Sequence, residues 1–293
     1  MGAAAGIVAD QLFGEPPLQP HPVAALGRAL QAVEHALYAD RRSAGIGHAT
    51  IGAGVGWAAG RFIKSTAAAT YLAVAGRALG EAANAVDAAL RHGDVAEARL
   101  LLPALVGRDP SRLDESGICR AVVESVAENT VDAVIAPAFW ACLAGAPGAL
   151  ACRAVNTMDS MVGHRTPRYV RYGWAAARLD DATAWVPARV TAMLVAACRP
   201  GAAADVFRVI RRDAPAHPSP NAGVAEAAFA AALGVRLGGE LSYGDQTETR
   251  PYLGDGRPAE RPDIDRAVRL SRDVSLSAAG VLGILGAARW TRG

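Results

Sequence analysis

Aromatic residues make up only 5% of this 293-residue chain, and charged residues only 20%. The formal net charge is +2, and no block of lysines or arginines alternates with aromatic residues. Nucleic-acid-binding proteins usually carry a strongly basic patch, so we expect no nucleic-acid partner. Cysteine is also scarce. The four cysteines have no CxxC spacing, and we expect them to be reduced and buried.

Two sequence signals of other protein classes are also missing. No basic segment precedes the short apolar start, so we expect no cleaved signal peptide, and membrane insertion would depend on internal segments. The motif G-x-x-x-x-G-K-[ST] does not occur, which excludes a P-loop for nucleotide binding. Neither an internal repeat nor a low-complexity linker interrupts the chain, so we expect residues 1–293 to form a single membrane-embedded domain.

Hydrophobic residues are abundant, at 52%, and three internal runs carry no formal charge: residues 43–60, 133–152 and 274–288. The run 133–152 approaches the roughly 20 residues that a helix needs to cross a bilayer core. Glycines in 43–60 suit close helix packing in lipid, and 274–288 could span only a thin or tilted path. This pattern predicts an all-α, polytopic integral membrane protein with polar loops and short re-entrant or buried helices.

A helix with several carboxylates precedes the run 133–152. Glu124, Glu128 and Asp132 are four residues apart, so they fall roughly 40° apart on one stripe of a helix. Arg120 lies one turn before them. Acids beside an apolar segment are costly unless they hold a cation or a ligand. Two other interpretations stay open: a solvated acidic face, and a structural ion-pair network around Arg120.

Polar segments also lie between the other apolar stretches. Prolines at 16, 17, 20 and 22 fix the backbone and predict a stiff loop that holds Glu15 and His21. Residues 156–178 predict an arginine-rich polar loop edged by helix, and two acids, Asp180 and Asp181, follow it. The sequence Pro-Asn-Ala-Gly at 220–223 is typical of a turn, and the glycines between 238 and 256 predict a loop.

The order of these motifs resembles the CobD/CbiB family of cobalamin-biosynthesis proteins. The motifs are Asp10…Gly14-Glu15-Pro16-Pro17…His21-Pro22-Val23, Glu124…Glu128-Asn129…Asp132, Asn156-Thr157-Met158-Asp159-Ser160-Met161-Val162-Gly163, Arg178-Leu179-Asp180-Asp181, Pro187-Ala188-Arg189 and Ser219-Pro220-Asn221-Ala222-Gly223. The resemblance extends from near residue 10 to beyond Tyr243, which makes it far more specific than any single motif. The departures are a short N-terminal apolar segment, a compressed region around residues 51–70, and His164 where an aromatic residue is common.

The family consists of adenosylcobinamide-phosphate synthases. The resemblance therefore implies a multi-pass enzyme of the cell membrane that uses ATP and Mg²⁺ and whose catalytic loops face the cytoplasm. The implied reaction amidates the free carboxylate of adenosylcobyric acid with (R)-1-amino-2-propanol phosphate or the free amino alcohol. These substrates and the lipid bilayer are the expected partners, and a homo-oligomer stays open.

The resemblance also implies roles for residues whose chemistry suits this reaction. Carboxylate and amide oxygens are ligands for Mg²⁺, and arginine binds phosphate through two parallel hydrogen bonds. The expected catalytic residues are Glu124, Glu128, Asp132, Asn156 and Asp159, and the expected metal ligands are Glu128, Asp132, Asp159, Asp180 and Asp181. The expected substrate-binding residues are Asp10, Glu15, His21, Arg165, Arg168, Arg189, Ser219, Asn221 and Tyr243. The amine must lose a proton, and His21, His217 or a carboxylate could accept it.

Two functions from other classes stay open. One is a non-catalytic, AmpE-like membrane protein with a signalling role. The dense acids and polar side chains between residues 124 and 181 argue against it, because a scaffold does not need them. The other is a cation-coupled membrane transporter whose intramembrane acids bind the ion. An amide product that depends on ATP would distinguish the enzyme from both.

Overall fold

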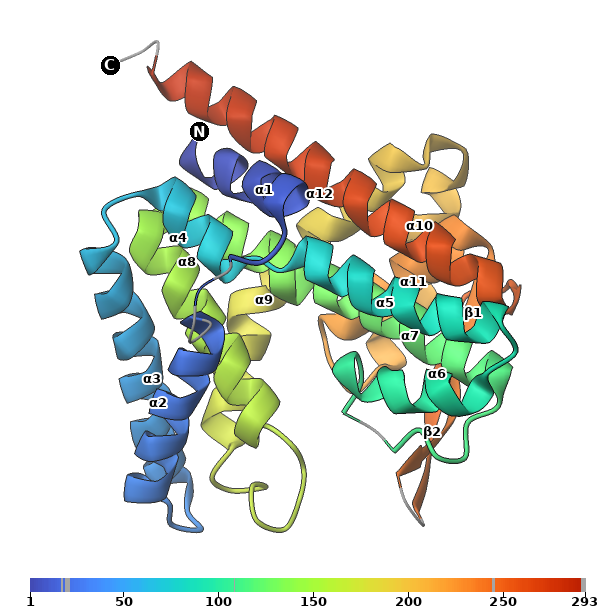
Figure 1. Ribbon diagram of the computed structural model, residues 1–293, viewed down its shortest axis with the longest axis horizontal. Coiled ribbons are helices and arrows are strands. Elements are labelled where there is room, and N and C mark those ends of the chain that lie inside the picture. Colours follow the sequence, from blue (N-terminus) through green and yellow to red (C-terminus); the bar gives the residue numbers. More distant parts are fainter. Residues whose placement is uncertain (17, 19–21, 108, 244–245, 291–293) are drawn as a thin grey trace. The chain divides into compact units, whose positions relative to one another are not determined.

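Helices form most of the chain, and they group into two units. The computed structural model describes residues 1–16, 18, 22–107, 109–243 and 246–290 (Figure 1). Unit 1 comprises Met1–Ala75, Asp132–Pro187 and Ala278–Gly293, and unit 2 comprises Gly76–Val131 and Ala188–Ser277. The mainly helical class is confirmed, with one small sheet in addition. The expectation of a single domain stays a prediction.

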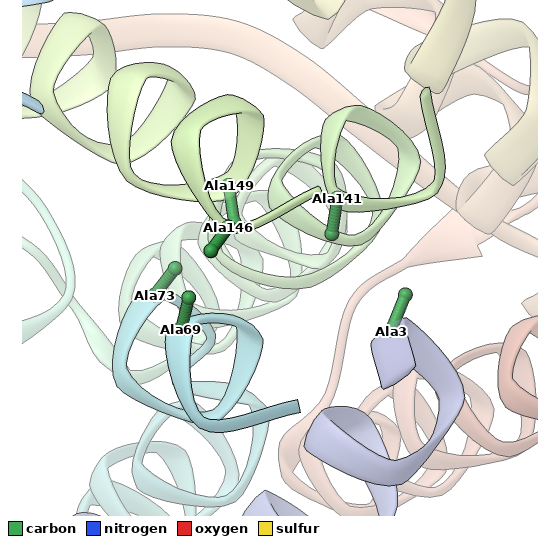
Figure 2. Close-up of a cluster of buried hydrophobic side chains, with 6 residues drawn as sticks. All are labelled: Ala3, Ala69, Ala73, Ala141, Ala146 and Ala149. Atoms are coloured by element: carbon green, nitrogen blue, oxygen red, sulfur yellow. The ribbon is translucent and has the colours of Figure 1, made fainter. Parts of the chain in front are cut away.

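In the part of the chain that the structure describes, unit 1 contains only helices and their connections. Its helices are α1 (Gly2–Phe13), α2 (Pro22–Leu37), α3 (Arg42–Phe62), α4 (Thr66–Ala73), α8 (Ala136–Val162), the first half of α9 (Trp174–Cys198) and the end of α12 (Arg261–Trp290). Helices α1, α4 and α8 meet at a cluster of alanines, Ala3, Ala69, Ala73, Ala141, Ala146 and Ala149 (Figure 2). Such small side chains let helix backbones approach closely, which explains how a chain with few aromatic residues fills its interior.

Glycines allow α3 to lie directly against α8. A Cβ atom at Gly56 would lie 2.5 Å from the carbonyl oxygen of Leu150, and one at Gly60 would overlap the backbone of Pro147. The close packing expected for residues 43–60 is thus confirmed. Large apolar side chains of α3 are exposed, namely Ile46, Ile51, Val55, Trp57 and Phe62.

Prolines lie inside the helices α8 and α9 of unit 1. In α8, Gly145 has φ 66° and ψ −151°, which breaks the helical geometry just before Pro147. In α9, Pro187 has no N–H to donate to the carbonyl oxygen of Thr183. The indole nitrogen of Trp140 donates to that oxygen at 3.0 Å instead, so a hydrogen bond from α8 fixes the position of α9.

Unit 2 packs helices around a three-stranded sheet. Its elements are α5 (Gly76–Arg91), α6 (Val95–Leu101), α7 (Glu115–Thr130), the end of α9, α10 (Ala203–Asp213), α11 (Ala222–Leu233), β1 (Val235–Tyr243), β2 (Gln246–Leu253), β3 (Arg257–Pro258) and the start of α12. The sheet order is β2-β1-β3, with β1 antiparallel to β2 and parallel to β3. The loop predicted between residues 238 and 256 is therefore wrong for most of that segment. The register shifts between Leu237 and Gly239, so the glycines form a bulge and do not end the strand.

The helix that carries the acids is less regular than the sequence predicts. It begins after Asp114, whose side chain accepts a hydrogen bond from the Gly117 amide, and α7 ends at Thr130. A π-helical turn, Val131–Ile135, then leads into α8. Because Asp132 lies in this turn, the α-helical spacing of about 100° per residue does not apply to it. The polar loop predicted at residues 156–178 is shorter than expected, because α8 continues to Val162 and α9 begins at Trp174.

Two helical segments are long and apolar enough to cross a membrane, as far as the described residues extend. They are Glu115–Val162, which includes the π-helical turn, and Arg261–Ala288. A third results if α9 and the helical path through Ala216 are counted together, although they are bent by 111°. The span predicted at 43–60 is not among them. With its 21 residues α3 is long enough, but its glycines and His48 lower its hydropathy.

Candidate functional site

Polar side chains from α8, α9 and the π-helical turn gather in unit 1. We call Asp132, Arg153, Asn156, Asp159, Asp180 and Asp181 the polar cluster. Their charges are close enough to interact: Asp132 with Arg153, and Asp181 with Asp159. Asp132 and Asp180 are also both within electrostatic range of Cys152, the neighbour of Arg153. The sequence analysis assigned a role to each of these residues except Arg153.

The α8 part of the cluster is one strip of side chains. Arg153, Asn156 and Asp159 recur every third residue, and residues three apart are neighbours on a helix surface. Helix α3 contacts α8 through Leu150 and Ala154, which lie roughly 60–100° around the helix from Arg153. The polar strip and the α3 contact therefore occupy different sides of α8.

Gly163 gives the carboxylate of Asp159 its place at the end of α8. The amide of Gly163 donates to the carbonyl oxygen of Asp159 at 2.7 Å. A Cβ atom at position 163 would overlap Oδ1 of Asp159. The Asp159 carboxylate therefore folds over the helix end, and this position must lack a side chain. This explains physically why Asp159 and Gly163 stand four residues apart in the motif.

Helix α9 supplies the other two acids. Arg178 Nη1 lies 3.2 Å from Oδ2 of Asp181, one turn later on the same helix. Asp181 is also within electrostatic range of Asp159 and of Arg165. Arg165 itself is exposed on the connection between α8 and α9. Two carboxylates from different helices thus lie near one another, with an arginine beside them.

The other arginine predicted on this connection is already engaged. Arg168 Nη2 donates to Oε1 of Glu34 at 3.2 Å, and the Tyr169 hydroxyl donates to the same oxygen at 2.8 Å. The guanidinium of Arg168 also lies 4.1 Å from the ring centre of Tyr38. Hydrogen bonding with Tyr169 and Glu34 raises the pKa of Arg168. These contacts tie the α8–α9 connection to α2, and the substrate-binding role of Arg168 stays a prediction.

The predicted N-terminal site residues are only partly described. Asp10 is buried on α1 and accepts a hydrogen bond from Gln11 Nε2 at 3.0 Å. Glu15 is within electrostatic range of Arg153, which brings it to the edge of the polar cluster. His21 lies outside the described residues. Tyr243 lies at the end of β1, but its side chain is also outside the description.

In unit 2, Glu124 and Arg120 hold the bulge of β1. The Gly238 amide donates to Oε1 of Glu124 at 2.9 Å, and Arg120 Nη1 donates to the Gly238 carbonyl oxygen at 2.6 Å. Arg120 Nε lies 3.9 Å from Oε1 of Glu124. The two side chains thus satisfy both polar groups of one glycine. The catalytic role expected of Glu124 stays a prediction. Glu128 is half-buried near the end of α7, and its expected catalytic role also stays a prediction.

A second group of polar side chains in unit 2 surrounds the turn before α11. His217 Nδ1 lies 3.1 Å from both the amide and the carbonyl oxygen of Ser219, and Nε2 lies 3.8 Å from Oε1 of Glu226. Ser219 Oγ accepts from the Ala222 amide at 3.1 Å. Asn221 Oδ1 accepts from Arg189 Nη1 at 2.9 Å. Sequence reasoning did not assign a role to Glu226, although a lone acid in an apolar helix was the available signal.

The side-chain oxygens of these acids can be compared with the ligands that Mg²⁺ requires. No group of three or more His, Cys, Asp or Glu side chains could hold a metal ion among the residues that the structure describes. Mg²⁺ often keeps several waters and uses only one or two carboxylates together with substrate phosphates. Asp159 and Asp181 come from different helices and lie within electrostatic range of each other, so they are the candidates for such a pair. The described residues form no dedicated protein cage for the ion.

Comparison with known proteins identifies relatives along almost the whole chain. The family model described as CobD/Cbib protein matches residues 3–271. A cobalamin biosynthesis protein CobD from Mycobacterium tuberculosis is 47% identical over 298 residues, which cover 97% of this chain and 95% of the relative. The protein of the same description from Chromobacterium violaceum is 41% identical over 306 residues, covering 95% and 96%.

A third relative covers less of the chain. The CobD protein of Rhodobacter capsulatus is 45% identical over 213 residues, or 72% of this chain and 68% of the relative. No solved structure matches the chain. Every motif that suggested the resemblance lies within the matched residues 3–271. The chain belongs to the CobD/CbiB family of cobalamin-biosynthesis proteins.

Proposed function

We propose that this protein is an ATP- and Mg²⁺-dependent ligase that joins adenosylcobyric acid to (R)-1-amino-2-propanol phosphate or the free amino alcohol. Family membership supports a role in cobalamin biosynthesis with a corrinoid substrate. The observation that carries the specific reaction is the polar cluster, where acids from two helices lie beside arginines within unit 1. Phosphoryl transfer to a carboxylate depends mainly on positioning and charge neutralisation, which such a cluster can supply.

Each part of the cluster has a task in this reaction. Asp159 and Asp181 would hold Mg²⁺, which supplies neutralisation of phosphate charge when bound. Arg165 is exposed beside them and can approach a phosphate oxygen. Asn156 lies between Arg153 and Asp159 on the strip and offers an uncharged donor and acceptor to a substrate amide.

The amine must lose a proton before it attacks the activated carboxylate. His217 is poorly suited to accept this proton, because its ring is buried and Nδ1 is within 3.1 Å of two backbone groups of Ser219. Its other nitrogen is directed at Glu226, 3.8 Å away. A carboxylate of the polar cluster, or His21, is therefore the better candidate for the base.

We also propose a multi-pass location in the cell membrane. The segments Glu115–Val162 and Arg261–Ala288 have the length and composition of spans. Arg165, Arg168 and Arg171 follow the first of these, and Arg208, Arg211 and Arg212 lie on α10. Positive residues favour the cytoplasmic side, where ATP is available, so both arginine groups are assigned to that side.

The reaction is tested by incubating purified protein in detergent or nanodiscs with adenosylcobyric acid, ATP, Mg²⁺ and aminopropanol phosphate. The expected product has the mass of the amide, and its formation requires all four components. Asp159→Asn and Asp181→Asn should fold normally and lose turnover by about two orders of magnitude or more. Glu128→Gln and Asp132→Asn test the predicted acid stripe in the same assay. Absence of amide product from folded wild-type protein would favour the signalling or transport alternative.

A further inference from the structure

Arg153 is the member of the polar cluster whose side-chain Nε finds no acceptor among the residues that the structure describes. Its Nε is sealed from solvent and has no hydrogen-bond partner. Among the described residues, no carboxylate lies within ion-pair distance of its guanidinium. The residue as a whole is partly exposed, so a ligand can approach it.

This arrangement is unfavourable for the protein alone. A guanidinium withdrawn from water without a paired carboxylate destabilises a fold, because it loses hydration and gains no hydrogen bond. Arginine cannot relieve this cost by losing its proton. Asp132 and Glu15 are near enough to act on the charge, but neither accepts a hydrogen bond from it. A ligand that supplies an anion would provide the interaction that the protein lacks.

The other arginines considered for phosphate binding differ from Arg153. Arg168 donates to Glu34 at 3.2 Å, and Arg189 donates to Asn221 at 2.9 Å. Arg165 lies on the exposed connection after α8, where water solvates it. Among these four arginines, Arg153 is therefore the one whose Nε is buried and has no hydrogen-bond partner.

The shape of the Arg153 guanidinium and the acids near it indicate which kind of anion could bind. The planar guanidinium matches two oxygens of a phosphate and binds them in parallel. A bare anion would be repelled by Asp132 and by the Asp159–Asp181 pair. A phosphate that arrives with a divalent cation avoids this repulsion, because the cation neutralises the acids.

We propose that Arg153 binds a phosphoryl group of a substrate in the polar cluster. This inference rests on the proposed function, which requires ATP and accepts a phosphorylated amino alcohol. Both molecules carry the same phosphate chemistry, so either could be the source of the group. Arg153 would lower the free energy of that complex through a bidentate contact with the phosphate, which no described residue of the protein provides.

The test measures binding and thermal unfolding of the protein in nanodiscs, without turnover. The variants are Arg153→Met, which keeps an unbranched chain about as long as the aliphatic part of arginine and removes the charge, and Arg153→Lys, which keeps the charge and removes the planar guanidinium. Arg171→Gln is the matched control, because Arg171 is an exposed arginine of unit 1 that lies 3.9 Å from Asp40. The probes are ATP with Mg²⁺, aminopropanol phosphate with Mg²⁺, and free aminopropanol.

Wild type and Arg171→Gln should be stabilised by a phosphorylated probe. The ligand-free Arg153→Met protein should melt at the wild-type temperature or a few degrees above it, because an unpaired charge has been removed. Its affinity for the phosphorylated probe should fall at least about tenfold, and Arg153→Lys should lie between the two. If the Arg153 variants lose affinity for ATP alone, the phosphoryl group belongs to the nucleotide. If they lose affinity for aminopropanol phosphate but not for free aminopropanol, the phosphoryl group belongs to the amine substrate.

Two results would overturn the proposal. One is unchanged affinity of both Arg153 variants for all probes. The other is early melting of ligand-free Arg153→Met together with a normal ligand-induced shift in Arg153→Lys, which would make Arg153 structural. Wild-type protein that forms the amide while Arg153 variants bind normally would reject this inference and leave the proposed function. If phosphate binding depends on Arg153 but wild-type protein forms no amide, the inference about Arg153 holds and the proposed function is rejected.

Discussion

Carboxylates that look alike in the sequence have different surroundings once the chain is folded. Glu124 is buried and accepts a hydrogen bond from the backbone of Gly238, which gives it a structural task. Asp159 has its position secured by Gly163 and lies near a second acid, Asp181. Residue type and helical spacing could not separate these cases, because the difference depends on which backbone groups other segments bring to each acid. The motif order nevertheless pointed to both.

Glu124 provides the first prediction. Glu124→Ala removes the acceptor of the Gly238 amide and a carboxylate that lies 3.9 Å from Arg120 Nε, so the free energy of unfolding should fall by about 3–5 kcal/mol. Glu124→Gln keeps an acceptor oxygen and should lose less. Thermal unfolding and amide formation per folded molecule are measured together. Full stability of Glu124→Ala with little turnover would instead support the catalytic role expected from the sequence.

Gly163 provides the second prediction. Gly163→Ala places a methyl group where Oδ1 of Asp159 lies, so the carboxylate must move. Amide-forming activity should fall by at least about tenfold, while the melting temperature changes by only a few degrees. Gly54→Ala on α3 is the control, because a Cβ there meets no atom within 4 Å. Equal activity of the two variants would show that the position of Asp159 is not critical.

At the scale of elements, the sequence predicted close helix packing better than it predicted where helices are interrupted. The glycines of 43–60 correctly indicated close packing. The sheet was missed because Gly238 and Gly239 suggested a loop, whereas side chains of α7 satisfy the backbone of the bulge. That support comes from residues more than 110 positions away, which local patterns do not report.

The contact between α3 and α8 provides the third prediction. A side chain at Gly56 would press on the Leu150 carbonyl oxygen, so Gly56→Ala should destabilise the protein by about 1–3 kcal/mol. Gly54→Ala faces open space on the same helix and should stabilise it by about 0.5–1 kcal/mol, since alanine is the better helix former. Thermal unfolding in one detergent compares the two. Stabilisation by both substitutions would contradict the direct contact.

An ion-pair network on α10 provides the fourth prediction. Asp255 accepts hydrogen bonds from Arg212 and Arg208, which lower its pKa from 3.8 to about 2. Because the folded protein holds the charged form more strongly, this contribution is complete above about pH 4 and is lost as the pH falls toward 2. The melting-temperature difference between wild type and Asp255→Asn should therefore close over this window. Asp40→Asn serves as the control, since Asp40 lies 3.9 Å from Arg171 and outside this network. A difference that stays constant with pH would contradict the assignment.

For the whole molecule, family membership and the apolar surfaces of the helices both support the proposed function at a membrane. The matched residues 3–271 include both the polar cluster and the segment Glu115–Val162. Exposed apolar side chains occur on α1, α3 and α12, including Phe13, Phe62 and Ile284. In water such side chains would favour aggregation, whereas in lipid they cost nothing to expose. The number of spans could not be read from uncharged runs alone, since α3 is uncharged over much of its length but not strongly apolar.

Location and orientation provide the last prediction. If the apolar helices lie in a bilayer, the protein should stay in the membrane fraction after a high-salt or carbonate wash, and recovery in the soluble fraction without detergent would contradict this. Orientation is tested in a background that lacks the four native cysteines, which are all free. Single cysteines at Arg168 and Arg211, on the two arginine-rich segments, should resist an impermeant thiol reagent in intact cells and react after permeabilisation. Labelling of either position in intact cells would move that segment away from the ATP-containing side, and would therefore count against the proposed chemistry as well as the topology.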